Sequence, residues 1–164
     1  MKVFHGSTVI VNTPLVCVGR NNLDFGKGFY VTDLKEQAIS WAIRPMNANK
    51  PHLVNVYEFE KDKVREAGYR YRQFMAYDAE WLEFVVASRK GQAMWQDYDV
   101  IEGGIANDRV FNTIELYSQG LITQDMALQR LKYEQPNNQI CIISQEVADN
   151  YLHFIDSSTV KEKE

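Results

Sequence analysis

Two short segments of the chain place glycines next to side chains that can bind a flat, polar ligand. The first is His5-Gly6-Ser7, in which an imidazole precedes a glycine that leaves the backbone N–H and C=O unobstructed. These groups suit hydrogen bonds to a carboxamide or a hydroxyl group. A histidine beside an apolar strand is commonly a structural residue, but a core strand has little use for the Gly-Ser that follows. We therefore interpret His5, Gly6 and Ser7 as candidate binding residues.

The second segment is Phe25-Gly26-Lys27-Gly28-Phe29-Tyr30, a glycine-punctuated turn that runs into a short strand. Its spacing matches neither a Walker loop nor the dinucleotide-binding G-x-G-x-x-G pattern. Tyr30 leaves the turn on the strand, and Trp41 follows eleven residues later on the next predicted helix. The two rings can form the walls of a slot for a flat ring. Two core aromatics in simple contact are the alternative interpretation.

Hydrophobic patterning predicts the elements that position these residues. Strands are expected over residues 3–11, interrupted at Gly6-Ser7, and over 53–59, 98–101, 139–143 and 151–155. Helices are expected over residues 34–44, 79–89, 108–117 and 123–133, with a short one after Ser144. This order indicates an α+β domain. We place the domain at residues 1–157 and expect residues 158–164 to form a frayed polar tail.

Charge, cysteine content and hydropathy argue against several classes of protein. The net charge of −4 disfavours a general nucleic-acid-binding protein, which needs a basic face. The basic stretch with Arg65, Arg70 and Arg72 could still bind a polyanion, or it could be a solvated loop. Cys17 and Cys141 lack a metal-ligand spacing, so no metal is expected. Without a signal-peptide pattern or an apolar run of about 20 residues, we expect a cytoplasmic protein with no membrane contact.

The two glycine-containing segments together resemble the catalytic region of diphtheria-toxin-like ADP-ribosyltransferases. The second is also similar to a motif of the poly(ADP-ribose) polymerases, in which Phe-Gly-Lys-Gly, an aliphatic residue and a tyrosine precede a helix. The chain further resembles a small bacterial family of single-domain proteins with that fold and an uncharacterised function, through Trp81-Leu82-Glu83-Phe84-Val85, the 104–109 segment and Gln139-Ile140. The likeness covers residues 1 to about 155.

This resemblance implies a fold and a substrate. The fold would be a split pair of small antiparallel β-sheets with flanking helices around an NAD cleft. His5 would bond the ribose, the backbone of Gly6 would pair with the nicotinamide carboxamide, and Tyr30 would stack on the nicotinamide ring. The NAD-binding residues would thus be His5, Gly6, Ser7, Gly28, Tyr30 and Trp41. NAD would be a substrate, and transfer through an oxocarbenium-like ribose would need no metal.

One position departs from the pattern of that superfamily. Its third motif usually places a glutamate at the start of a late strand, and Gln139 stands there in this chain. A glutamine amide can bind a ribose hydroxyl, but it cannot act as a general base. Glu134 lies in the segment that contacts acceptors in such enzymes and is a candidate base, with a solvated helix end as the alternative. The catalytic residues that the resemblance implies are His5, Tyr30, Gln139 and Glu134.

The activity that the resemblance implies is mono-ADP-ribosyl transfer from NAD to an unknown macromolecule, protein or nucleic acid, with release of nicotinamide. Polymer formation is not expected, because Gln139 carries no negative charge. The family resemblance and the single-domain size suggest a toxin of a bacterial toxin–antitoxin or antiphage system, with an antitoxin protein as a partner. A catalytically inert NAD-binding, nucleotide-binding or interaction module, and an NAD glycohydrolase that uses water as acceptor, are the alternatives.

Overall fold

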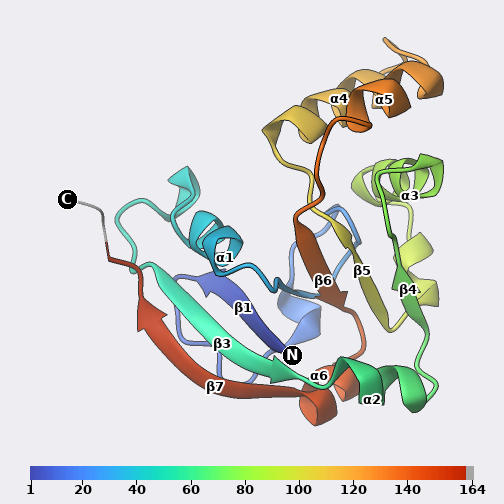
Figure 1. Cartoon of the computed structure of the whole chain (residues 1–164). Coiled ribbons are helices and arrows are strands. Elements are labelled where there is room, and N and C mark those ends of the chain that lie inside the picture. Colours follow the sequence, from blue (N-terminus) through green and yellow to red (C-terminus); the bar gives the residue numbers. More distant parts are fainter. Residues whose placement is uncertain (162–164) are drawn as a thin grey trace.

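Two small β-sheets flanked by helices form the framework of the protein (Figure 1). The computed structural model describes residues 1–161. One sheet, of order β1-β3-β7, consists of the antiparallel strands β1 (Lys2–Ser7), β3 (Leu53–Phe59) and β7 (Leu152–Thr159). The other, of order β2-β6-β5-β4, consists of β2 (Phe29–Val31), β6 (Asn138–Ile142), β5 (Val100–Gly104) and β4 (Tyr71–Gln73). Because β4 is parallel to β5 and the other pairs are antiparallel, the sheets are mostly antiparallel and the predicted α+β class is confirmed.

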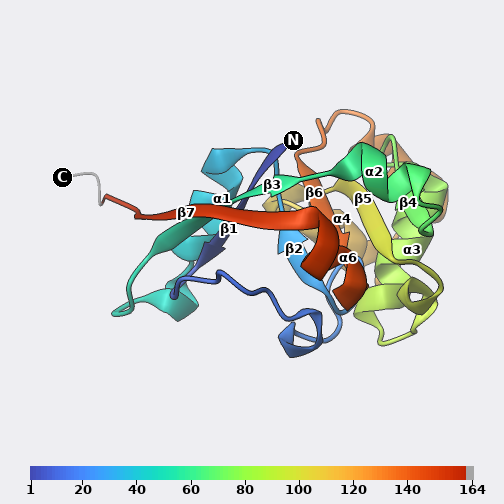
Figure 2. The ribbon, with the colours of Figure 1, turned by 90° about the horizontal axis from the view of Figure 1, so that it is seen from below.

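Helices cover both sheets. They are α1 (Lys35–Ala42), α2 (Lys61–Glu66), α3 (Ala79–Arg89), α4 (Asp108–Ser118), α5 (Gln124–Leu131) and α6 (Gln145–Tyr151). Figure 1 and Figure 2 both place α1 beside the three-stranded sheet and α3 beside the four-stranded one. None of the described helices combines the length and the apolar composition that crossing a bilayer requires.

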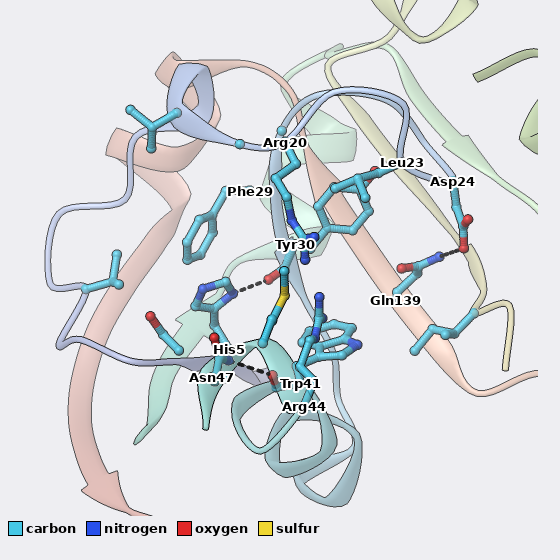
Figure 3. A pocket seen from close by; sticks show the side chains of 18 of the residues that line it. His5, Arg20, Leu23, Asp24, Phe29, Tyr30, Trp41, Arg44, Asn47 and Gln139 are labelled. Carbon is cyan, nitrogen blue, oxygen red and sulfur yellow. Dashed lines mark hydrogen bonds between the residues drawn. The ribbon is translucent and has the colours of Figure 1, made fainter. Parts of the chain in front are cut away.

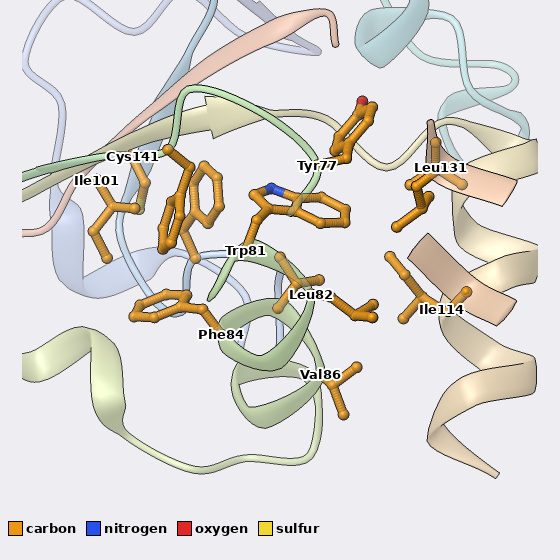
Figure 4. Close-up of a cluster of buried hydrophobic side chains, with 14 residues drawn as sticks. Tyr77, Trp81, Leu82, Phe84, Val86, Ile101, Ile114, Leu131 and Cys141 are labelled. Atoms are coloured by element: carbon orange, nitrogen blue, oxygen red, sulfur yellow. The ribbon is translucent and has the colours of Figure 1, made fainter. Parts of the chain in front are cut away.

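A core around Trp81 fixes α3 against the four-stranded sheet (Figure 4). The helix begins where the Asp78 carboxylate accepts a hydrogen bond from the Trp81 N–H at 2.9 Å, a normal N-cap. Nearly every side chain of α3 from Trp81 to Ser88 is then buried. The indole N–H of Trp81 also donates to the Gly104 carbonyl at 3.2 Å. The core therefore anchors the end of β5, which lies next to the cavity described below.

The two sheets also share a second core. It joins Val3 and Tyr57 of the three-stranded sheet to Val100, Ile140 and Ile142 of the four-stranded sheet. Complete burial of each such side chain contributes about 1.5–3 kcal/mol to stability. The sheets are therefore held together by apolar contacts rather than by a continuous ladder of strands.

Within residues 1–161, one isolated backbone bridge nevertheless connects the sheets. The Phe4 N–H donates to the Thr32 carbonyl at 2.7 Å, and the Thr32 N–H donates to the Phe4 carbonyl at 2.9 Å. Phe4 precedes His5 on β1, and Thr32 follows β2. The bridge therefore brings the two glycine-containing segments of the sequence side by side.

The structure corrects the prediction for the first strand. β1 runs without interruption through Gly6 and ends at Ser7, whereas a strand to residue 11 with a break at Gly6-Ser7 was expected. Glycine is needed at position 6 for packing, because a Cβ atom there would lie 1.9 Å from the Ala38 carbonyl oxygen and 2.8 Å from the Ala42 nitrogen. Gly6 thus lets α1 pack closely on the strand.

Two other segments differ from expectation. In the basic stretch, Arg65 belongs to α2, Arg70 lies between the two elements, and Arg72 belongs to β4, which pairs with β5 over only three residues and therefore gives no periodic pattern. The last strand continues past the predicted domain boundary at residue 157, because Ser158 and Thr159 pair with Val54 and Leu53 of β3. The frayed tail expected from residue 158 therefore starts as a strand, and its residues 162–164 lie outside the described residues.

Candidate functional site

A cavity of about 620 Å³ opens between β1, β2, the end of α1 and the loop that joins β1 to β2 (Figure 3). This volume lies in the range of small-molecule binding sites. The structure brings seven of the predicted site residues to its walls: His5, Gly6, Ser7, Gly28, Tyr30, Trp41 and Gln139.

The imidazole of His5 is held in one tautomer. Its Nδ1 lies 2.6 Å from the backbone carbonyl oxygen of Tyr30, and its ring centroid lies 4.3 Å from that of Phe29. Burial lowers the pKa of His5 to about 4. The hydrogen bond to Tyr30 raises this pKa, and the positive charge of Arg44 lowers it. The ring is therefore neutral at pH 7. Because a carbonyl only accepts, Nδ1 carries the proton and Nε2 is a free acceptor.

The backbone of Gly6 faces the same cleft. Alternate residues of a strand direct their N–H and C=O groups to the same edge. The N–H and C=O of Phe4 bond to Thr32 at one edge of β1, so the N–H and C=O of Gly6 point toward the same edge. The bridge ends before Gly6, and Gly6 lines the cavity there. Gly6 can therefore offer a donor and an acceptor to a carboxamide.

Tyr30 closes the glycine turn on itself. Its hydroxyl donates to the Gly26 carbonyl at 2.6 Å and accepts from the Phe25 N–H at 3.1 Å. Burial raises the pKa of this hydroxyl well above its ordinary value. With its hydroxyl engaged by the backbone, Tyr30 contributes an aromatic wall to the cavity rather than a proton.

Gly28 lies where the turn packs against β6. A Cβ atom at this position would lie 2.6 Å from both the Cys141 sulfur and the Ile142 carbonyl oxygen, so the close approach requires glycine. Burial raises the pKa of the Cys141 thiol to about 12. The thiol is therefore protonated at neutral pH and does not act as a nucleophile.

Trp41 and Arg44 close the cavity from the end of α1. The Asn47 amide donates to the carbonyls of Trp41 and Ala42, at 3.3 Å and 3.0 Å, and so completes hydrogen bonding at the end of the helix. This contact fixes the helix end from which Trp41 faces the cavity (Figure 3).

Two arginines of the cavity share no counter-charge. Arg20 and Arg44 both line the cavity, and neither forms an ion pair within residues 1–161. Burial lowers the pKa of Arg44, and the positive charge of Arg20 lowers it further. Two guanidinium groups held near one another without a carboxylate attract an anion. Sequence reasoning missed both residues, because neither belongs to a motif.

Gln139 lies in a buried polar cluster at the other side of the cavity. Its side chain is 4% exposed, and its amide nitrogen is 3.3 Å from the Asp24 carboxylate and 3.4 Å from the Gly104 carbonyl. The same carboxylate accepts a hydrogen bond from Arg89 Nε at 2.8 Å. Asp24 and Arg89 also line the cavity and were not predicted. The signal for Asp24 was its place directly before the glycine turn.

Glu134 is not among the residues that line the cavity. It follows α5, where its N–H bonds the Leu131 carbonyl at 3.0 Å. The structure therefore does not bring the predicted acceptor-side base to the other site residues, since it belongs to the end of a helix that packs on α4 rather than on the cleft.

The arginines of the basic stretch are engaged elsewhere. Arg65 bonds Gln73, Arg70 pairs with Asp99 at 3.3 Å, and Arg72 pairs with Glu80. Two of these partners, Asp99 and Glu80, are carboxylates that offset the positive charge. None of these arginines lines the cavity, so the stretch is not part of the candidate site.

The chain belongs to the protein family described as "Protein of unknown function (DUF3990)", whose model matches residues 1–154. Comparison with curated proteins and with solved structures gave no significant match. Within residues 1–161, no group of three or more His, Cys, Asp and Glu side chains is placed to hold a metal ion. The fold and the cleft therefore define an α+β protein with a cavity of small-molecule size.

Proposed function

We propose that the protein is an NAD-dependent mono-ADP-ribosyltransferase. The observation that carries this proposal is the contact between His5 and the Tyr30 carbonyl, which joins the two sequence segments in one cleft and leaves a neutral imidazole with a free acceptor nitrogen. The resemblance of these segments to ADP-ribosyltransferases supplies the identity of the ligand. The cavity has groups that suit the nicotinamide, its ribose and the diphosphate of NAD.

The nicotinamide end would lie between the aromatic walls. The rings of Tyr30 and Trp41 suit stacking on the pyridinium, and the backbone of Gly6 suits the two hydrogen bonds of the carboxamide. His5 Nε2 would accept a hydrogen bond from a ribose hydroxyl. Protonation of the ring would remove this acceptor and place a positive charge against the cationic nicotinamide.

The diphosphate would lie at Arg20 and Arg44. A dianion relieves the repulsion between two guanidinium groups, and each arginine can form charge-assisted hydrogen bonds to phosphate oxygens. The proximity of Arg44 to His5 places this anion site next to the ribose acceptor. The cavity therefore has aromatic walls, an acceptor nitrogen and a cationic pair, which suit the nicotinamide, the ribose and the diphosphate of this ligand.

The chemistry breaks the glycosidic C–N bond of NAD. The electron pair leaves with nicotinamide, which becomes neutral, and the ribose carbon develops oxocarbenium character. A nucleophilic atom of the acceptor then bonds to that carbon and loses its proton to the acceptor's own environment or to water. Gln139 cannot take this proton, and Cys141 is protonated and cannot attack, so the chain supplies orientation and charge rather than a covalent intermediate.

The acceptor would be a macromolecule that docks at the mouth of the cleft. Apolar side chains line the cavity and are also strongly exposed there, with Leu15 at 49%, Met46 at 56% and Val18 at 73%. An exposed apolar rim around a polar cleft is typical of an interaction surface. We propose a toxin role in a toxin–antitoxin or antiphage system, in which an antitoxin protein restrains transfer.

The test uses purified protein, NAD carrying separate labels on nicotinamide and adenylate, and a cell lysate. Adenylate label in protein, RNA or DNA, together with free nicotinamide, supports the transferase and identifies the acceptor class. Nicotinamide release without transfer identifies an NAD glycohydrolase. Binding of NAD without either product identifies the inert module that the glutamine at position 139 would favour, and absence of binding refutes the proposal.

A further inference from the structure

We propose that Asp24 is a positioning residue that turns Gln139 into a hydrogen-bond acceptor for a ribose hydroxyl. The inference rests on the proposed function for the identity of the ribose. Its structural part concerns only the orientation of one buried amide and can be tested without a ligand.

Arg89 keeps the Asp24 carboxylate in place. Arg89 ends α3, and its guanidinium contacts Asp24 Oδ1 through Nε at 2.8 Å and through a terminal nitrogen at 2.5 Å. The backbone N–H of Ala106 lies 3.4 Å from the other oxygen, Oδ2. The guanidinium also lies over the ring of Phe111, 4.6 Å from its centroid. An ionised carboxylate held in this way can only accept hydrogen bonds.

The remaining partner of Asp24 is therefore a donor. Oδ2 lies 3.3 Å from the amide nitrogen of Gln139, and that nitrogen also donates to the Gly104 carbonyl at 3.4 Å. Both N–H bonds of the amide are thus directed at acceptors of the protein. The amide oxygen is left to face the cavity, as Figure 3 shows. Its chemistry selects a hydroxyl donor and disfavours a carbonyl or a phosphate.

Gln139 and His5 then present two acceptors to the same cavity. The neutral His5 offers Nε2, and Gln139 offers its amide oxygen. Because the two acceptors lie on different sides of the cavity, each suits a separate hydroxyl group of the ligand. A ligand that lacks one hydroxyl leaves a buried acceptor unpaired, and such a loss is a strong basis for discrimination.

The same geometry explains why glutamine suits position 139. A glutamate there would place a carboxylate oxygen near Asp24 Oδ2 and the Gly104 carbonyl, with no proton between the three acceptors. Two carboxylates at this separation repel, and the pair takes up a proton only as the pH falls. Asp24 and Gln139 therefore form a matched acceptor and donor.

Exchanging the partners tests this match. In Gln139→Glu, two carboxylates face each other. In Asp24→Asn, the asparagine keeps its oxygen toward Arg89, so its amide N–H faces the amide N–H of Gln139 and two donors meet. In the double variant Asp24→Asn/Gln139→Glu, the Asn oxygen still accepts from Arg89 and its N–H donates to Glu. We expect both single variants to lose stability and the double variant to recover the part of the loss that comes from the contact between residues 24 and 139.

The ligand-free readout is the melting temperature at pH 8 and pH 5, each variant being compared with the wild type at the same pH. Gln139→Glu should melt roughly 5 °C below wild type at pH 8. It should approach wild type at pH 5, whereas the double variant should show no such pH dependence. Asp99→Asn, which removes a carboxylate from the pair with Arg70 outside the cavity, is the matched control and should leave the pocket unchanged. Additive losses in the double variant would overturn the proposed orientation.

The ligand readout is calorimetric binding of NAD and of its analogue without the 2′-hydroxyl on the nicotinamide ribose. The wild type should bind NAD at least tenfold more tightly than the analogue, and Asp24→Asn should lose this preference, because the Gln139 amide would turn its oxygen toward the Asn N–H and its nitrogen toward the cavity. The double variant should regain NAD affinity to within about threefold of wild type. A coupled melting cycle in a protein that binds no NAD would refute the proposed function and keep the Asp24 orientation. NAD binding with no coupling between positions 24 and 139 would refute the orientation alone.

Discussion

The backbones of Phe4 and Thr32 are hydrogen bonded in both directions, at 2.7 Å and 2.9 Å, across the gap between the two sheets. Because these residues adjoin the His5 and Tyr30 segments, the bridge sets the distance from the imidazole to the Tyr30 carbonyl. The candidate site is therefore built where two sheets meet, and each sheet contributes one of the two sequence segments. Changes to the site should affect ligand binding more than the packing of the two hydrophobic cores.

Replacement of His5 by alanine should remove the acceptor nitrogen and abolish NAD turnover while the fold persists. The loss of one hydrogen bond to a ribose hydroxyl should weaken NAD binding by roughly tenfold. Binding is measured by calorimetry, turnover by nicotinamide release and the fold by circular dichroism. His153→Ala is the control, because His153 lies on the exposed strand β7 and pairs there with Glu60. Unchanged turnover in a folded His5→Ala protein would contradict the site assignment.

The lowered pKa of His5 predicts a loss of stability in acid. The unfolded chain protonates this ring near its ordinary pKa of 6.5, and the folded protein does so only near 4. Between these values the unfolded state holds more protons, so the free energy of unfolding falls as the pH is lowered from about 6.5 to about 4. For this partly buried ring the loss is on the order of 2 kcal/mol. Urea unfolding across this pH range measures it.

Two variants isolate the contribution of this ring to the pH dependence. His5→Asn should remove the component between pH 6.5 and 4, because asparagine does not titrate. His153→Asn should leave it in place, since His153 lies on the surface and contacts Glu60. An equally steep decline in His5→Asn would show that the buried neutral imidazole is not its cause.

Sequence reasoning located the residues whose signal is local. His5, Gly28 and Tyr30 stand in glycine-containing segments, and the helices expected over residues 79–89 and after Ser144 are present as α3 and α6. Asp78 at the start of α3 and Ser144 at the start of α6 act through a hydrogen bond to a residue three positions later, a spacing that is visible in the sequence.

The residues that were missed act through distant contacts. Asp24 meets Gln139 across 115 positions of the chain and Arg89 across 65. No periodicity or spacing encodes such pairs, because they arise only when the loop before the glycine turn packs against the ends of α3 and β6. Arg20 and Arg44 were likewise visible only as isolated charges. Gly6 was read as a break in a strand, whereas the close packing of α1 requires it.

Removing the charges of Arg20 and Arg44 should weaken binding of the diphosphate part of NAD. Glutamine at either position should lower the affinity for NAD and for ADP-ribose by about tenfold, the scale of a charge-assisted hydrogen bond, and leave the affinity for nicotinamide unchanged. Arg20→Gln should not destabilise the free protein, since it relieves repulsion with Arg44. Arg70→Gln, outside the cavity, is the control. An equal loss for nicotinamide would contradict an anion site at these residues.

Trp41 should contribute to nicotinamide binding through its ring. Trp41→Ala should weaken NAD binding by roughly 1–3 kcal/mol, the scale of lost stacking on an aromatic side chain. Trp41→Phe should retain part of this affinity, because a smaller aromatic face remains. Calorimetric titration of both variants with NAD and with nicotinamide separates the stacking contribution from effects on the diphosphate. An unaltered affinity in Trp41→Ala would mean that the ring serves only as part of the core.

The conformation of the glycine turn at Gly26 can be tested by substitution. Gly26 and Gly68 both have a φ of +82°, so alanine is strained at either position by about 1 kcal/mol. A Cβ atom at Gly26 would also lie 2.0 Å from Cγ of the Trp95 ring, whereas at Gly68 it would meet no atom within 4 Å. Gly26→Ala should therefore lower the free energy of unfolding, measured with urea, by about 2 kcal/mol more than Gly68→Ala, which is the scale of an overpacked core.

Because the Gly26 carbonyl accepts a hydrogen bond from the Tyr30 hydroxyl, displacement of the turn in Gly26→Ala should also weaken NAD binding, while Gly68→Ala leaves NAD binding unchanged. Equal costs at the two positions would mean that Trp95 yields to the added methyl group and does not define the turn.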